Sequence, residues 1–127
     1  MDLSLLKALS EADAIASSEQ EVRQILLEEA DRLQKEVRFD GLGSVLIRLN
    51  ESTGPKVMIC AHMDEVGMMV RTIEDDGFLG ITKVGGIDPR VLPAHEVVVH
   101  GREELFGVIG AKPPHVTTPA EREKMIP

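Results

Sequence analysis

The sequence predicts an α/β layer followed by a small, β-rich barrel or sandwich. Two observations lead to this prediction. Apolar residues recur at helical spacing near the N-terminus, before about residue 35. Beyond Gly67, short strand-like segments alternate with turn residues, with no helical period between them. We therefore predict two parts, residues 1–67 and residues 68–127.

Two helices are expected in the first part. A short helix covers residues 3–9, and Ser18 with Glu21 three residues later forms a capping box that predicts the start of a second. One face of this second helix is apolar, and its members are Val22, Ile25, Leu26, Ala30 and Leu33. The other face is expected to meet solvent and carries Arg23, Glu28, Glu29, Asp31 and Arg32.

Strands are expected from residue 36 onward. Residues 36–39 and 45–49 alternate around the turn 40–43, which predicts a hairpin. The continuous apolar run 57–61 is typical of a strand covered on both faces. Four further strands are predicted, over residues 68–73, 78–84, 96–100 and 105–109, with Asp75-Asp76-Gly77 as a hairpin turn. Thr118, Pro119 and Glu121 predict the start of a last helix.

Composition excludes some classes of function. The net charge of −8 and the lack of a clustered Lys/Arg face argue against a nucleic-acid partner. No apolar run approaches the ~20 residues that a membrane-spanning helix needs, so we expect no membrane partner. A lone cysteine, Cys60, and no recognisable leader segment favour a cytoplasmic location. Cys60 itself is expected to be a small core residue.

Polar residues follow the apolar run abruptly. His62 and Asp64 lie two apart, so their side chains leave an extended chain on the same side, and Glu65 leaves on the other. An imidazole oriented by a nearby carboxylate is a common metal ligand. From the residues alone, a metal ligand and a hydrogen-bonded structural histidine remain equally open. His95, His100 and His115 are expected to be surface or loop residues.

The chain also carries a series of motifs in a recognisable order. They are Asp40-Gly41-Leu42-Gly43, the stretch from Ala61 to Gly67, Asp76 to Leu79, Val84 to Leu92, and Gly107 to His115. Together they resemble peptidase family forty-two, the dinuclear-metal aminopeptidases that include glutamyl and deblocking aminopeptidases. Departures from the family pattern are Asp13-Ala14, where a Pro-Gly pair is common, and Ser44 in place of Asn.

The resemblance implies a fold and a site. The first part would belong to a zinc-aminopeptidase-like α/β sandwich, and residues 68–127 to a truncated β-barrel insertion used for dimerisation. His62 would bind one of two divalent metal ions (zinc, cobalt or manganese), Asp64 would be the catalytic carboxylate beside it, and Glu65 would lie just outside the ligands or face the substrate. No other cofactor-binding residue is implied.

The resemblance also implies an activity. The reaction would remove N-terminal residues from peptide substrates, in homo-oligomers ranging from a dimer to a dodecamer. The family's other ligands and general base are absent from this chain, so we expect an N-terminal portion that supplies part of the active site and is inactive alone. An inactive oligomerisation module and another two-metal amidase or carboxypeptidase of the same clan remain alternatives.

Overall fold

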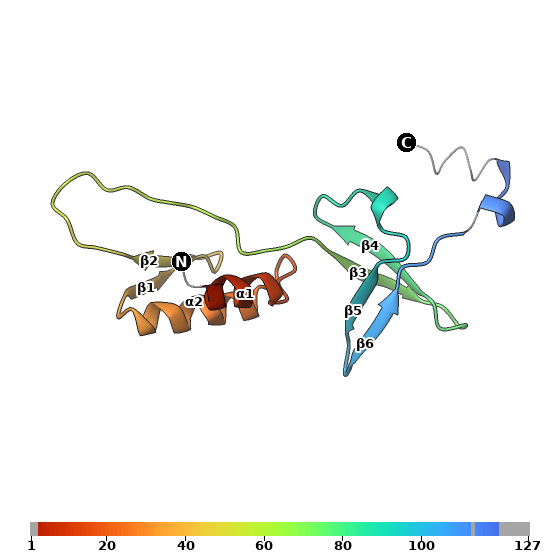
Figure 1. The fold of residues 1–127 in the computed structure, drawn as a ribbon, viewed down its shortest axis with the longest axis horizontal. Helices are drawn as coiled ribbons and strands as arrows, with labels where there is room; N and C mark the ends of the chain where they lie inside the picture. Colours follow the sequence, from red (N-terminus) through yellow and green to blue (C-terminus); the bar gives the residue numbers. More distant parts are fainter. Residues whose placement is uncertain (1–2, 113, 120–127) are drawn as a thin grey trace. The chain divides into compact units, whose positions relative to one another are not determined.

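The computed structural model describes residues 3–112 and 114–119, which fall into two compact units, Met1–Ile87 and Asp88–Pro127. The first unit contains α1 (Leu3–Glu11), α2 (Gln20–Arg32), β1 (Glu36–Phe39), β2 (Val45–Arg48), β3 (Gly67–Ile73) and β4 (Leu79–Val84) (Figure 1). The second contains η1 (Pro89–Val91), β5 (Glu96–His100), β6 (Glu104–Val108) and η2 (Pro114–Val116).

Both predicted helices are present, but the predicted capping box is wrong. The residue before α2 is Glu19, and no side chain caps the helix. Ser18 Oγ donates instead to Gln20 Oε1 at 3.1 Å. The Glu21 carboxylate accepts from the backbone N–H of Asp13 at 3.0 Å, so it stabilises the connection between α1 and α2.

The core of the first unit is small and aliphatic. Ala14, Val22 and Ala30 are 2%, 7% and 2% exposed. Ile25 and Leu26 of the predicted apolar face are half-buried, whereas Leu33, just after α2, is exposed. The face predicted from the sequence is therefore the one that packs from Val22 to Ala30, and Leu33 lies outside the covered part.

Strands β1 and β2 form the predicted hairpin. They pair antiparallel, with Val37 opposite Ile47. In the turn, Asp40 Oδ1 accepts the N–H groups of Leu42 at 2.9 Å and Ser44 at 2.8 Å. Hydrogen bonds from Ser44 and then from the other turn amides hold the pKa of Asp40 below its usual value. Gly43 has φ +87°, in the left-handed region that glycine adopts readily.

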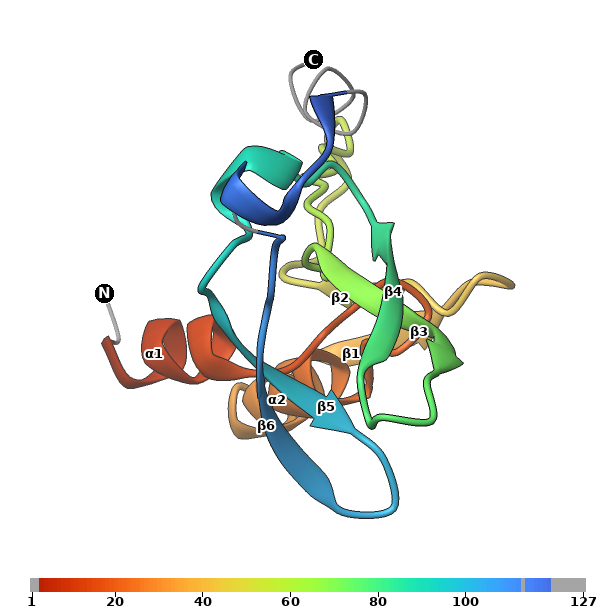
Figure 2. The same ribbon diagram turned by 90° about the vertical axis from the view of Figure 1, so that its right-hand side faces the viewer.

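Two further hairpins confirm the other predicted strands. β3 pairs with β4 across a turn in which Asp76 Oδ1 accepts the Phe78 N–H at 3.3 Å, and β5 pairs with β6 from Glu96–Val108 to His100–Glu104 (Figure 2). Within the described ranges, the six strands form three separate two-stranded sheets. A mixed helix and sheet fold is thus confirmed, and the barrel stays a prediction.

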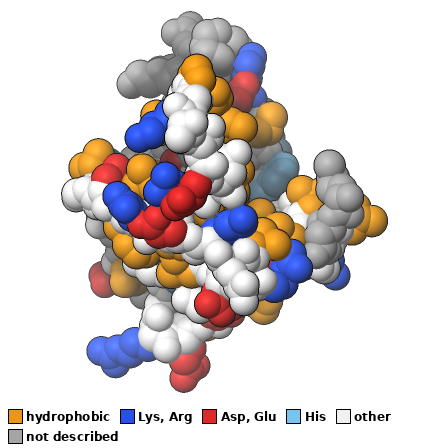
Figure 3. Space-filling view, turned by 90° about the vertical axis from the view of Figure 1, so that its left-hand side faces the viewer, with side chains coloured by type: hydrophobic (Ala, Val, Ile, Leu, Met, Phe, Trp, Pro, Cys, Tyr) orange, Lys and Arg blue, Asp and Glu red, His pale blue; other side chains and the backbone are white. Residues whose placement is uncertain are grey.

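The predicted buried strand over residues 57–61 is wrong in this structure. Val57, Met58 and Ile59 are 86%, 78% and 88% exposed, and the segment has no strand geometry. No strand among the described residues pairs with its backbone, so neither face is covered. Cys60 is accordingly exposed and is not the core residue that the sequence predicts. Hydrophobic side chains open to solvent are visible in the space-filling view (Figure 3).

Two predictions about organisation lie outside what the structure tests. The division at residues 67 and 68 concerns a catalytic part and a barrel part, and it stays a prediction. The predicted last helix falls mostly on residues 120–127, outside the described residues. Over the residues that are described, no helix is both long and apolar enough to cross a membrane.

Candidate metal site at His62 and Asp64

The chain just after Asp64 is fixed to the α1–α2 connection. The Glu65 N–H donates to the Ala14 carbonyl at 2.7 Å, and the Ala14 N–H donates to Glu65 Oε1 at 3.1 Å. Ile15 and Glu65 form an isolated parallel bridge. Two hydrogen bonds at the buried Ala14 therefore fix the point at which the polar stretch ends.

Gly67 allows this close approach. A Cβ atom on Gly67 would lie 2.6 Å from Ile15 Cδ1 and 3.0 Å from Ile15 Cγ1, closer than carbon atoms pack. The Ile15 side chain therefore packs directly over the Gly67 backbone because position 67 has no side chain. This contact ends the polar stretch and begins β3.

His62 and Asp64 lie together, as their spacing predicts. His62 Nδ1 is 2.8 Å from the Asp64 backbone oxygen and 3.2 Å from Asp64 Oδ1. The side chains are 85% and 43% exposed. A carbonyl oxygen only accepts hydrogen bonds, so Nδ1 carries a proton, and in the neutral ring Nε2 then keeps its lone pair. This is the tautomer that a histidine needs to bind a metal through Nε2.

The pair borders a cavity of about 300 Å³ within the first unit. Its other lining residues come from the start of α2, from the β1–β2 turn and from the extended chain, and they are Glu19, Arg23, Leu26, Leu42, Gly43, Ser44, Val45, Ala61 and Met63. The polar end of the extended segment therefore faces a concave surface that two other elements help to form.

This donor set fits part of a metal site. His62 offers Nε2, and Asp64 offers a carboxylate close by. Within the first unit's described residues, no third His, Cys, Asp or Glu side chain joins them at ligand distance. A catalytic zinc usually takes three protein ligands, so the pair is compatible with a fraction of such a site. The Glu65 carboxylate, the remaining predicted site residue, is bonded to Ala14.

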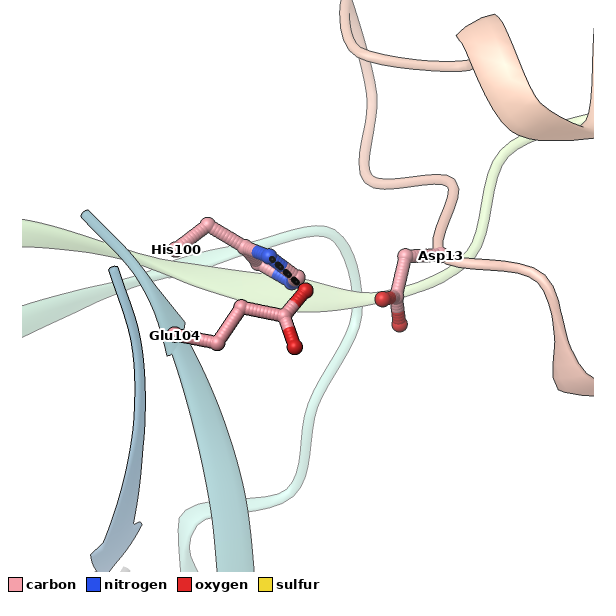
Figure 4. Close-up of side chains that lie close together, drawn as sticks. All are labelled: Asp13, His100 and Glu104. Atoms are coloured by element: carbon pink, nitrogen blue, oxygen red, sulfur yellow. Dashed lines mark ion pairs between the residues drawn. The ribbon is translucent and has the colours of Figure 1, made fainter. Parts of the chain in front are cut away.

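The other histidines lie on the surface, as predicted. His95 and His115 are exposed. His100, at the end of β5, forms an ion pair of 3.8 Å between Nδ1 and Glu104 Oε1 of β6 (Figure 4). Asp13, also labelled in that view, belongs to the first unit. We assign no functional role to these side chains.

Arg23 is the cavity residue that the sequence interpretation missed. It was expected on the solvent face of α2, but it is half-buried and lines the cavity. Helical spacing contains the signal, because residues 23, 26 and 30 lie on one face, at i, i+3 and i+7. Because Arg23 is charged, a search for apolar residues at helical spacing did not include it.

Comparison with known proteins identifies the family. Residues 43–127 match the family model described as M42 glutamyl aminopeptidase. The FrvX protein of Escherichia coli (strain K12) is 40% identical over 126 residues, covering 98% of this chain and 35% of that protein. A lysyl aminopeptidase of Pyrococcus furiosus is 33% identical over 123 residues, covering 95% and 35%. The chain belongs to the M42 family of aminopeptidases.

Solved structures agree with this assignment. A TET aminopeptidase from a marine sediment Thaumarchaeota archaeon has a TM-score of 0.88 and 35% identity, covering 98% of this chain and 36% of that one. A structure described as the PhTET1-12s dodecamer has a TM-score of 0.76 and 34% identity, covering 93% and 36%. The chain thus spans about a third of the length of the relatives it matches.

Proposed function

We propose that this chain supplies part of the active site of a metal-dependent aminopeptidase that removes N-terminal residues from peptides. The M42 family is metal-dependent in general. The observation that carries the proposal is the His62–Asp64 geometry. The Asp64 carbonyl accepts the hydrogen bond from Nδ1, so Nε2 of the neutral ring can bind a metal ion.

The residues of the chain have distinct roles in this proposal. His62 binds one of two divalent ions through Nε2. The Asp64 carboxylate, 3.2 Å from Nδ1, keeps the ring oriented. Glu65 fixes the end of the segment through Ala14 and so determines where the pair lies. The metal ions would polarise the scissile carbonyl and acidify the attacking water.

The finer fold and assembly belong to the same proposal. Residues 68–127 would form part of a β-barrel that mediates homo-oligomers, from a dimer to a dodecamer. The exposure of Phe106 at 87% and Val108 at 67% supports an interface on β6. The PhTET1-12s relative is described as a dodecamer. A cytoplasmic location and the use of zinc, cobalt or manganese remain expectations within the proposal.

An oligomerisation module without activity is the second candidate. It is favoured by the large apolar side chains on β3 to β6 that face solvent, among them Met69, Ile73 and Leu105 at 60%, 77% and 59% exposure. In this case the chain would associate with copies of itself, and sedimentation would show oligomers in the absence of any metal.

Replacing His62 tests the main proposal. In the whole protein loaded with zinc, cobalt or manganese, H62A should lose bound metal, measured by mass spectrometry. Hydrolysis of aminoacyl-p-nitroanilides should fall below detection, because one imidazole ligand has been removed. H95A is the matched control, since His95 is an exposed histidine outside the cavity.

Two outcomes would contradict the proposal. Full metal content in H62A would exclude His62 as a ligand. An inactive wild-type protein that forms oligomers without metal would favour the module instead. For the 127-residue chain alone we expect no turnover, and metal-stimulated release of nitroaniline from it would show that the site is complete.

A further inference from the structure

Arg23 is half-buried beside the His62–Asp64 pair without a hydrogen-bond partner for its Nε. The Nε atom is buried, and none of the described residues accepts its hydrogen bond. Burial of a guanidinium N–H without an acceptor costs free energy. The position of this side chain is therefore not explained by a local ion pair.

The guanidinium group packs closely against Gly43. A Cβ atom built on Gly43 would lie 3.0 Å from Arg23 Nη2, 3.6 Å from Cζ and 3.8 Å from Nη1. The Nη2 end of the guanidinium thus occupies the space that a side chain at position 43 would take. Arg23 and the β1–β2 turn are fitted to one another.

The charges around the cavity give Arg23 a second role. The carboxylates of Glu19 and Asp64 line the same cavity. Of the described lining residues, Arg23 is the one that carries a permanent positive charge. Arg23 can therefore balance the charge of these carboxylates within the cavity, and its guanidinium lies against the turn at Gly43.

We propose that Arg23 is a positioning residue of this site, which holds the β1–β2 turn as one wall of the cavity facing His62 and Asp64. This inference rests on the proposed function for its kinetic consequences, whereas its structural consequences are independent of activity. Arg23 need not touch the substrate, because it acts through the turn and through the charge balance of the cavity.

Kinetics on the whole protein separate charge from volume. At full metal occupancy, R23M keeps the volume but removes charge and donors, and kcat/KM should fall about 10- to 100-fold, as for other groups that orient ligands. R23K should lose less because it keeps the charge. Added guanidinium ion should restore part of the activity of R23A, but none to H62A. Wild-type kcat/KM in R23M would overturn the proposal.

Hydrogen exchange tests the fit of Arg23 to Gly43 without any activity. R23A and G43A should each increase exchange at the hydrogen-bonded turn amides of Asp40, Leu42, Gly43 and Ser44. G43A should add less in the R23A background than in the wild type. G41A is the control, because a Cβ at Gly41 meets nothing within 4 Å and its φ is not left-handed. If the wild-type protein is inactive, the proposed function fails, and hydrogen exchange alone then tests the positioning role of Arg23. Unchanged exchange in R23A would then overturn the role of Arg23.

Discussion

The residues on either side of His62 and Asp64 differ sharply in how they are held. Val57 to Ile59 have no backbone partner among the described residues and are 78–88% exposed. Glu65 and Gly67, a few positions later, contact Ala14 and Ile15 through two hydrogen bonds and a close carbon contact. Specific contacts, and not the apolar pattern, therefore decide which of the two regions is packed against the rest of the unit.

This contrast separates two sources of order. Contacts with a nearby helix connection fix the end of the segment within this chain. The apolar residues before it have a strand's composition but need neighbours on both faces to become one. Four predictions, from the largest expected effect to the smallest, test whether these contacts hold the two regions differently.

Gly67→Val should be the most damaging change. Its Cβ would lie 2.6 Å from Ile15 Cδ1, so overpacking should cost about 1–3 kcal/mol in the opening free energy of the Glu65 amide. Hydrogen exchange of that amide is the measurement. Ile15→Ala should partly restore protection by making room, and equal exchange in wild type and G67V would refute the close contact.

Glu65→Ala should have the next largest effect. It removes the acceptor of the Ala14 N–H and should lower the opening free energy of that amide by about 1 kcal/mol. The loss is no larger because Glu65 is exposed and water can replace part of the hydrogen bond. E65Q keeps an acceptor oxygen and should lose less. An E65A protein with unchanged exchange at Ala14 would show that the backbone bond alone holds the contact.

Acid should loosen the β1–β2 turn by a smaller amount. Hydrogen bonds from Ser44 and the other turn amides lower the pKa of Asp40 in the folded state below its unfolded value. Its stabilising contribution is therefore complete above the unfolded pKa and is lost as pH falls through the folded pKa. Amide shifts of Leu42 and Ser44 should follow this titration, and D40A should abolish it. Shifts that titrate at the ordinary aspartate pKa would contradict the bonds.

Substitutions in the exposed half should change least. V57D and I59K should alter the opening free energy at Glu65 by less than about 0.5 kcal/mol, because both side chains are almost fully exposed. In the 127-residue chain they should also reduce self-association by removing exposed apolar surface, measured by sedimentation. A large loss of protection at Glu65 would show that the apolar segment is packed after all.

Sequence patterns predicted what local contacts determine. The α2 apolar face and the three hairpins follow from spacing and from turn residues such as Gly43 and Gly77, whose φ values are +87° and +89°. Burial of Val57 to Ala61 did not follow from their apolar run, because a buried strand needs neighbouring strands, and no strand among the described residues pairs with this segment. The predicted capping box was also wrong, because the Glu21 carboxylate accepts the Asp13 N–H instead of capping α2.

In the candidate site, too, local geometry could be predicted from the sequence and contacts between distant elements could not. The same-side arrangement of His62 and Asp64 follows from the two-residue period of an extended chain. Neither the bond between Glu65 and Ala14 nor the packing of Arg23 on Gly43 could be predicted, because both join elements that are distant in sequence. Sequence periodicity describes one element at a time and carries no information on which elements meet.

The contact between Ala14 and Glu65 also has a consequence for the order of folding. Its partners are 51 residues apart. At about 5–20 residues per second, Ala14 leaves the ribosome about 3 to 10 s before Glu65. A hairpin such as β1–β2 closes in about 1–10 μs. The hairpin and the helices are therefore complete before the polar stretch can dock, so His62 and Asp64 reach their places only after those elements have formed.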